Sequence, residues 1–189
     1  MEAIRTFIAV DVSDAVKRRA ADVVDRLRVA GAPVKWVEPA RMHITLQFLG
    51  NVSADEITAV CQHVEQAVHD IPSFQLHCEG LGAFPSIDRP RVVWLGCSAG
   101  SDRLIALHRA VESAMERLGF PPERREFHPH MTLGRIRRGN PTLQQLAALI
   151  RANTTFDAGT TDVHEVCVYS SSLKRQGPEY TPLSRAELA

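Results

Sequence analysis

The sequence contains one short pattern twice: a histidine and a threonine two residues apart, alternating with large apolar residues. The first copy is His43-Ile44-Thr45-Leu46 and the second is His130-Met131-Thr132-Leu133. Along a β-strand, side chains two residues apart point to the same face. Each copy therefore places an imidazole beside a hydroxyl above an apolar underside, and the chain must build two strands of this kind.

The two copies belong to a longer internal repeat. The expected helix caps Ser13 and Ser101 are 88 positions apart, the two histidines 87, and the caps Ser53 and Thr142 89. Runs of strand-forming residues predict strands at 6–12, 34–37, 42–49, 74–81, 91–96, 127–136, 163–170 and 180–183. The order predicts two pseudo-symmetric β-α-β-α-β repeats. Such halves tend to pack about a pseudo-two-fold axis, which would bring the motif strands to equivalent places.

Length and composition fit one domain, residues 1–189, with lobe-forming repeats at about 1–85 and 90–185. The 189 residues are 44% hydrophobic, which allows a substantial core. Lys plus Arg and Asp plus Glu both number 22, so no global charge attracts a nucleic-acid duplex, whereas a small anion or a strand end remains compatible. No run approaches the roughly 20 apolar residues of a membrane-spanning helix.

The cysteines and the N-terminal residues indicate the cellular compartment. The four cysteines are scattered, with no CxxC pair, and the first ten residues lack the pattern of a signal peptide. We therefore expect a reduced, cytoplasmic protein with buried thiols and no contact with a membrane. We also expect a monomer without an obligatory protein partner.

Two such His-Thr pairs facing each other would suit displacement at phosphorus. An imidazole has an ordinary pKa of about 6.5, so near neutral pH one ring can take a proton while the other gives one. In a displacement the attacking oxygen loses a proton and the leaving oxygen gains one. The threonine hydroxyls can donate hydrogen bonds to the non-bridging oxygens. This chemistry requires no metal and no cofactor.

The residues around the motifs carry a resemblance to a known family. The chain resembles the two-histidine (2H) phosphoesterases, and more closely their RNA 2′,3′-cyclic phosphodiesterase branch, historically called 2′-5′ RNA ligases. The likeness covers nearly the whole chain. Besides the two motifs, it rests on Arg5-Thr6-Phe7-Ile8-Ala9, Trp36-Val37-Glu38-Pro39, Phe48-Leu49-Gly50, Phe84-Pro85, Arg91-Val92-Val93-Trp94, Pro129, Gly134-Arg135 and Tyr180-Thr181-Pro182-Leu183.

The resemblance implies a bilobal α+β fold, with mostly antiparallel sheets around a central cleft. It implies metal-independent opening of 2′,3′-cyclic phosphates on RNA ends or nucleotides to 2′-phosphomonoesters, with possible reversible 2′-5′ ligation. His43 would be the proton donor to the departing 3′-oxygen and His130 the base that activates water. Because the repeats are pseudo-symmetric, the sequence alone leaves these two roles interchangeable.

The same resemblance assigns the phosphate ligands. Thr45 and Thr132 would hold the phosphate, and Arg135 would add charge-assisted binding. Strict alternation puts Arg135 on the face opposite His130, so its role requires a bulge or twist at Gly134. Near the chain end, where the family favours an aromatic residue, this chain has Ser184-Arg185-Ala186, so the resemblance supplies no base-stacking residue there.

Other interpretations of the same residues remain open. A protein that only binds RNA termini or nucleotides would use the histidines as hydrogen-bond donors to phosphate. His128 and His130 form an HxH pair, which can be half of a zinc site, but no cysteine or paired histidine is spaced to complete it.

The remaining candidates have structural explanations. By strand parity Phe48 faces the apolar underside, so we expect it in the core, with base stacking as the alternative. Phe7 and Trp36 are also expected to pack. The basic residues Arg135, Arg137 and Arg138 either guide an RNA backbone or form a solvated face. Lys174 and Arg175 would join them if the lobes bring the two segments together.

Overall fold

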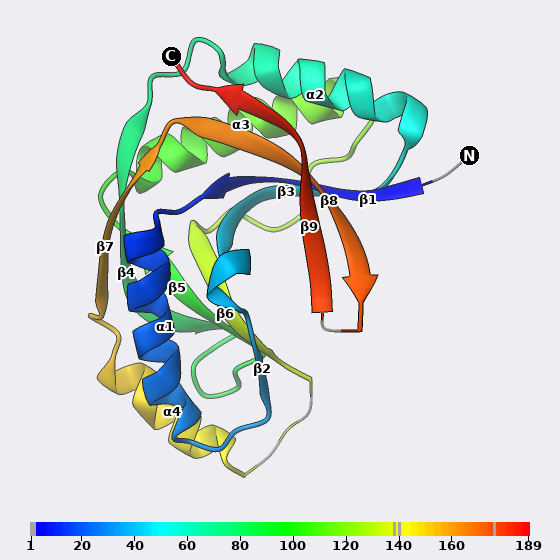
Figure 1. Cartoon of the computed structure of the whole chain (residues 1–189). Coiled ribbons are helices and arrows are strands. Elements are labelled where there is room, and N and C mark those ends of the chain that lie inside the picture. The colour runs from blue at the N-terminus through cyan, green and yellow to red at the C-terminus, as the bar shows by residue number, and fades with distance from the viewer. Residues whose placement is uncertain (1–2, 138, 140, 176) are drawn as a thin grey trace.

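The computed structural model describes residues 3–137, 139, 141–175 and 177–189. Within them the chain forms a mixture of helices and strands (Figure 1). The elements are β1 Ala3–Asp11, α1 Asp14–Arg28, β2 Val34–Trp36, the 3-10 helix η1 Pro39–Arg41, β3 His43–Ser53, α2 Ala54–Val68, β4 Phe74–Phe84, β5 Val92–Cys97, α3 Ser101–Arg117, β6 His130–Ile136, α4 Leu143–Ala152, β7 Asp157–Val163, β8 Glu165–Lys174 and β9 Gly177–Glu187.

The strands form two sheets in which neighbouring strands run antiparallel. The first sheet has the order β3-β1-β8-β9 and the second the order β2-β6-β5-β4-β7. In Figure 1, α2 and α3 lie along the first sheet, and α1 and α4 lie along the second. This confirms the expected α+β fold built from mostly antiparallel sheets.

The two sheets have matching strand orders but do not follow the two halves of the sequence. β3-β1-β8-β9 in the first sheet corresponds to β6-β5-β4-β7 in the second, to which β2 is added at the edge. β4 ends the first repeat yet pairs with β5, and β8 ends the second repeat yet pairs with β1. Each sheet therefore contains strands from both repeats, and the expected lobes of residues 1–85 and 90–185 do not correspond to the sheets.

Helix caps account for how the motif strands are connected. The Ser13 hydroxyl accepts the Val16 N–H at the start of α1, and Glu56 accepts the Ser53 N–H at the start of α2, as expected from the sequence. At α3 the cap is Gly100 and not Ser101. Gly100 has a φ of 87°, and a Cβ there would lie 2.2 Å from the Gln75 carbonyl oxygen, so only glycine fits.

The first sheet is covered differently on its two faces. Ile8 and Val10 of β1 point into the main core with the helices. Phe7 and Ala9 point to the other face, where they form a separate cluster with Cys167 and Tyr169, against which Tyr180 packs. This second face is mainly aromatic.

No helix in the described part of the chain is long and apolar enough to cross a membrane.

Candidate active site

β6 contains one extra residue relative to its neighbour β5. The register shifts between Thr132 and Gly134, which leaves Leu133 unmatched. After such a bulge the alternation of faces is offset by one residue. Arg135 is therefore exposed on the face of His130 and Thr132, not buried on the opposite face. The bulge required by the proposed role of Arg135 lies at the expected place.

β3 contains the same irregularity. Its register with β1 shifts between Thr45 and Gln47, which leaves Leu46 unmatched. Phe48 follows the bulge and is 53% exposed, with its ring centroid 6.0 Å from that of Phe7. The expectation that Phe48 lies in the core is therefore wrong, because the extra residue reverses the parity from which it was derived.

The His43 ring is held by its neighbours in a defined tautomer. Nδ1 lies 2.8 Å from the Arg41 carbonyl oxygen, which can only accept, so Nδ1 carries the proton. Nε2 then accepts a hydrogen bond from the Thr45 hydroxyl at 3.0 Å. The ring stacks on Phe7 at 5.0 Å between centroids and meets the edge of Tyr180 at 5.4 Å.

His130 is held in the same way. Nδ1 donates to the carbonyl oxygen of His128 at 2.6 Å, so Nε2 is the nitrogen left for chemistry. Its ring lies edge-on to Phe84 at 5.0 Å and 6.4 Å from Trp94. Each histidine thus donates Nδ1–H to the carbonyl two residues earlier and rests against aromatic rings. Phe7 packs as expected, and its ring also supports His43.

Burial lowers the pKa of both histidines from their ordinary value of 6.5. For His43 the Arg41 carbonyl and the nearby Asp11 oppose this shift. For His130 the His128 carbonyl opposes it. The positive charge of Arg135 lowers the pKa of both rings further. Since β3 and β6 also contact each other, the two imidazoles and this guanidinium share one electrostatic neighbourhood.

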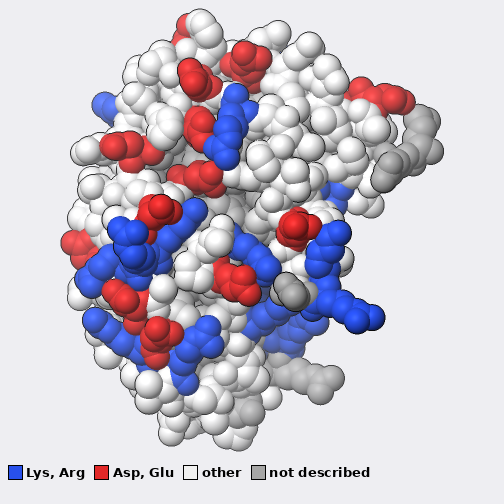
Figure 2. Space-filling view, in the orientation of Figure 1, with Lys and Arg blue, Asp and Glu red and all other residues white. Residues whose placement is uncertain are grey.

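Basic residues extend from this region. Lys35 of β2 pairs with Arg135 in register, and Arg91 donates to the Arg137 carbonyl at 3.2 Å. Figure 2 shows Lys and Arg side chains gathered mainly on the lower half of the visible face, with Asp and Glu among them. Arg138 lies outside the described residues, so the expected basic run is only partly visible.

Lys174 lies on the His43 side of the site. It lines a hollow of about 260 Å³ together with Arg41, Glu179 and Tyr180. Tyr180 is the ring that meets His43 edge-on, so the β8–β9 hairpin does approach the first motif. Arg175 follows Lys174 at the end of β8 and is exposed.

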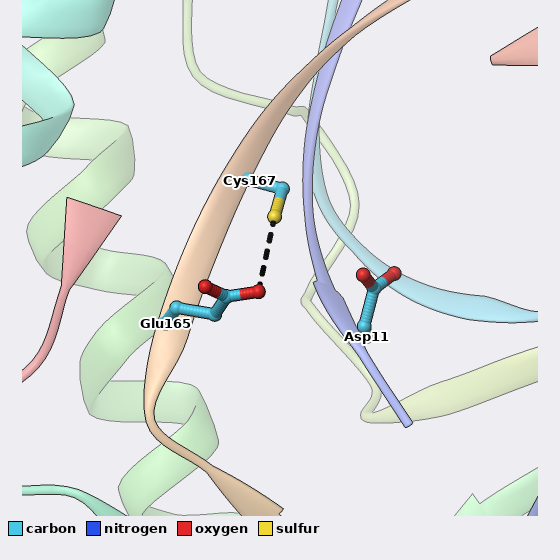
Figure 3. Close-up of side chains that lie close together, drawn as sticks. All are labelled: Asp11, Glu165 and Cys167. Carbon is cyan, nitrogen blue, oxygen red and sulfur yellow. Dashed lines mark hydrogen bonds between the residues drawn. The ribbon is translucent and has the colours of Figure 1, made fainter. Parts of the chain in front are cut away.

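Asp11, Glu165 and Cys167 form a compact group (Figure 3), and Asp11 of this group is paired with His43 in the register of β1 and β3. Their ligand atoms lie within 4.8 Å of one another, and the Cys167 thiol donates to Glu165 at 3.8 Å. Arg185 donates to Glu165 and to the Cys167 sulfur, and lies 3.7 Å from Asp11. One positive charge therefore already contacts both carboxylates. Among the described residues, neither His128 nor His130 belongs to a group of three or more side chains that could hold a metal ion.

Three residues near the site were not singled out by sequence reasoning. Phe84 and Tyr180 support the two catalytic candidates, and their only signal was that they lie in segments resembling the family. His108 of α3 donates Nδ1–H to the carbonyl oxygen of Leu46 at 2.9 Å and stacks on Phe127 at 4.1 Å. Nothing in its sequence context marks it, since the contact depends on tertiary packing.

Comparisons with known proteins identify relatives of this chain. A relative from Aeropyrum pernix named RNA 2′,3′-cyclic phosphodiesterase is 37% identical over 171 residues, 90% of this chain and 96% of the relative. One of the same name from Thermotoga maritima is 34% identical over 180 residues, 95% and 93% of the two chains. The crystal structure of Escherichia coli LigT complexed with 3′-AMP matches with a TM-score of 0.76 and 29% identity, covering 100% of this chain and 99% of that one.

The family itself is identified over most of the sequence. Residues 12–175 match the model of the 2′-5′ RNA ligase superfamily, a range that contains both motifs, Arg135 and every described strand except β1 and β9. The chain therefore belongs to the 2′-5′ RNA ligase superfamily.

Proposed function

We propose that this protein hydrolyses 2′,3′-cyclic phosphates at RNA ends or on nucleotides to 2′-phosphomonoesters, using its two histidines and no metal. The observation that carries the proposal is the matched state of the two rings. Each donates Nδ1–H to a backbone carbonyl, so that Nε2 is the nitrogen with the lone pair that proton transfer requires. The relatives named RNA 2′,3′-cyclic phosphodiesterase support the same substrate class.

In the proposed reaction the rings act on opposite sides of one phosphorus. Nε2 of His130 takes a proton from water as the water oxygen forms a bond to phosphorus. The bond from phosphorus to the ribose 3′-oxygen breaks, and protonated Nε2 of His43 gives its proton to that oxygen. The products are a 2′-phosphomonoester, a 3′-hydroxyl and His130 carrying the proton from water.

The phosphate ligands come from the same faces. Thr45 and Thr132 would donate hydrogen bonds to the non-bridging oxygens, where charge grows in the transition state. Thr45 now donates to Nε2 of His43, so its hydroxyl must turn away when that nitrogen is protonated and phosphate arrives. Arg135 would add a charge-assisted contact and offset the phosphate charge.

A second proposed reaction, reversible 2′-5′ ligation, uses the same groups. If the 5′-hydroxyl of a second RNA replaces water, the two strands are joined by a 2′-5′ linkage. If such a linkage takes the place of the cyclic ester as substrate, the strands are separated. We expect hydrolysis to dominate because water is in large excess. Rapid joining of two oligonucleotides with negligible opening of the cyclic phosphate would contradict this expectation.

The direct test is incubation with adenosine 2′,3′-cyclic phosphate and identification of the product. We expect the 2′-phosphate, formed at the same rate in EDTA. A 3′-phosphate would reverse the assignment of the leaving oxygen, and activity lost in EDTA and restored by zinc would refute the metal-independent mechanism.

The alternative function is binding of RNA termini or nucleotides without catalysis. A His43→Ala variant separates the two, because a catalytic histidine contributes roughly 10²- to 10⁴-fold to turnover. We expect turnover to fall by that order while adenosine 2′-phosphate still binds. A wild-type protein that binds this nucleotide and opens no cyclic phosphate would favour the binding function.

A further inference from the structure

The two motif histidines differ in the residue that lies opposite them on the neighbouring strand. Asp11 of β1 pairs with His43 of β3. In the equivalent place of the second sheet, Gly96 of β5 pairs with His130 of β6. Paired residues of antiparallel strands have Cα atoms about 4.5–5.5 Å apart and side chains on the same face. A Cβ at Gly96 would lie 3.1 Å from the Glu79 carbonyl oxygen, which leaves little room for a side chain. The pseudo-symmetric site therefore has a carboxylate opposite one histidine and none opposite the other.

The Asp11 carboxylate is held on the site face by contacts with β8 and β9. One of its oxygens accepts the Tyr169 hydroxyl at 2.8 Å, and the Arg185 guanidinium lies 3.7 Å away. Tyr169 stacks on Phe7 at 5.3 Å between ring centroids, and Phe7 stacks on His43 at 5.0 Å. The carboxylate and the imidazole are therefore fixed to the same aromatic cluster.

The charge of Asp11 acts on the His43 ring. Burial is the main cause that lowers the pKa of His43, and the charges of neighbouring side chains modify it. Asp11 has the largest effect of these charges and raises the pKa. Lys17 of α1 and Arg135 of β6 have smaller effects and lower it. The strongest charge beside His43 thus favours the protonated ring.

Other ionisable side chains around this pair are neutral or paired with one another. Burial raises the pKa of Cys167 to about 11 and also raises that of Tyr169, so both are uncharged at neutral pH. The ion pairs are Glu165 with Arg185 and Glu38 with Arg41. Because Arg185 is shared between two carboxylates, the group of Asp11, Glu165 and Arg185 keeps a net negative charge.

His130 has the opposite arrangement of charges. Burial lowers its pKa too, and the largest charge effect comes from Arg135, which lowers the pKa further. His128 also lowers it, and the exposed Glu123 raises it with the smallest effect of the three. The strongest charge near His130 thus favours the neutral ring.

We propose that the Asp11 carboxylate keeps a proton on His43 and thereby makes this histidine the acid and His130 the base. The proposal rests on the proposed function, which requires one protonated and one neutral histidine. Asp11 acts through the His43 ring and not on the substrate, so it is a positioning residue for the proton.

This role matters after every turnover. His130 then carries the proton taken from water, and His43 has given its own proton to the 3′-oxygen. Before the next turnover His130 must release a proton to the solvent and His43 must take one from it. A carboxylate beside His43 alone favours this return to the starting state.

NMR titration of the imidazole protons in an Asp11→Asn variant tests the proposal directly. Asparagine keeps the shape of the side chain and can still accept the Tyr169 hydroxyl, so mainly the charge is lost. We expect His43 to titrate at lower pH than in the wild type, while the titration of His130 moves far less. An unchanged His43, or equal shifts of both rings, would overturn the proposal. The titration needs no substrate, so its result is separate from whether the protein opens a cyclic phosphate.

The kinetic test uses hydrolysis of adenosine 2′,3′-cyclic phosphate. Above the pKa of an acid, its protonated fraction falls about tenfold for each unit by which that pKa is lowered. In Asp11→Asn we therefore expect kcat/KM near neutral pH to fall on the order of tenfold, with the limb that reports the acid moved to lower pH. Asp11→Glu restores the charge and should recover much of the loss. A pH profile of Asp11→Asn that matches the wild type would overturn the proposal.

A double variant shows whether Asp11 acts through His43. In a His43→Ala background, Asp11→Asn should cause no further loss of turnover, because the ring on which it acts is gone. Losses that multiply would overturn the proposal, since Asp11 would then act by another route.

Glu165→Gln is the matched control. It removes the other carboxylate of the same group, and its amide oxygen can still accept the Arg185 guanidinium. His43 should titrate close to its wild-type pH in this variant. A fall as large as that in Asp11→Asn would overturn the assignment of the effect to Asp11.

Discussion

His43 and His130 are both kept neutral by their surroundings. Burial lowers the pKa of each below 6.5, and the lone pair on Nε2 of a neutral ring is what a base requires. The proposed acid must instead be protonated, and that state becomes rarer as the pH rises above its lowered pKa.

The pH dependence of the reaction follows from these directions. We expect kcat/KM, which reports the free enzyme, to pass through a maximum on the acidic side of pH 6.5 and to fall toward neutral pH as the protonated acid is lost. The profile of kcat should lie at higher pH, because bound phosphate favours the imidazolium. Rates of hydrolysis of adenosine 2′,3′-cyclic phosphate between pH 4.5 and 8.5 give both the kcat/KM and the kcat profile. A kcat/KM maximum well above pH 7 would contradict the lowered pKa values of the two histidines.

A separate prediction at the residue scale concerns the replacement of Arg135. Its charge lowers the pKa of both histidines, so Arg135→Gln should raise both and move both limbs of the kcat/KM profile to higher pH. KM should also rise, by roughly tenfold or more, because a charge-assisted phosphate contact is lost. NMR titration of the imidazole protons gives the pKa values directly.

The matched control is Arg135→Lys. It keeps the charge but not the planar fork, so the histidine pKa values should stay near those of the wild type while KM still rises. If the glutamine variant leaves both titrations unchanged, Arg135 does not act on the two rings together.

At the scale of elements, α3 connects the two motif segments through His108. This buried ring bonds the carbonyl of Leu46, the extra residue of the β3 bulge, and stacks on Phe127, which precedes β6. Glu112, one turn further along α3, accepts the Glu123 N–H of the loop that leads to β6. One helix face therefore holds both strands on which the histidines lie.

We predict that His108→Ala disturbs both stability and catalysis. It leaves the Leu46 carbonyl unsatisfied, at about 1–3 kcal/mol in the free energy of unfolding, and it loosens the bulge that positions Thr45 and Phe48. Turnover should fall roughly 10- to 100-fold, as expected when reacting groups are misplaced. Thermal unfolding and steady-state kinetics measure the two effects.

His108→Asn provides the control for this prediction. Its amide N–H can take the place of Nδ1–H, so much of the turnover should return although the ring is gone. Leu146→Ala, a core truncation in α4, should lower stability with little effect on turnover well below the melting temperature. If His108→Ala behaves like this core variant, the contact serves stability alone.

Local signals in the sequence predicted most elements, and the failures have physical causes. The caps Ser13 and Ser53 were correct because their hydrogen bonds are local. The bulge in β3 was missed because strict alternation assumes one residue per partner, and an extra residue leaves no signal in apolar spacing. β7 was missed because its sequence, DAGTTDV, is mostly small and polar, and only its pairing with β4 makes it a strand.

At the scale of the whole molecule, the internal repeat was visible in the sequence but the pairing of its strands was not. β4 satisfies its apolar pattern whether it pairs within its own repeat or with β5 of the other repeat. The structure has the second arrangement, and β8 does the same with β1. The proximity of Tyr180 to His43 follows from this topology, since β9 joins the first sheet through β8.

Because each sheet contains strands from both repeats, we predict that the two halves of the chain depend on each other to fold. When fragments 1–88 and 89–189 are produced separately, β4 in one and β8 in the other lack the strands they pair with. We expect each fragment alone to lack native sheet structure and activity, and mixing to restore both. Circular dichroism and hydrolysis of a cyclic phosphate measure the result. A fragment that folds cooperatively alone would show that the halves are independent domains.

The central claim is that two imidazoles far apart in the sequence meet at one phosphate, and a crystal structure with adenosine 2′-phosphate tests it most directly. We predict that Nε2 of His43 and Nε2 of His130 both lie within hydrogen-bond distance of that nucleotide's phosphate or of the 3′-oxygen, with the Thr45 and Thr132 hydroxyls on its remaining oxygens. A phosphate that contacts one histidine while the other lies beyond its reach would contradict the claim.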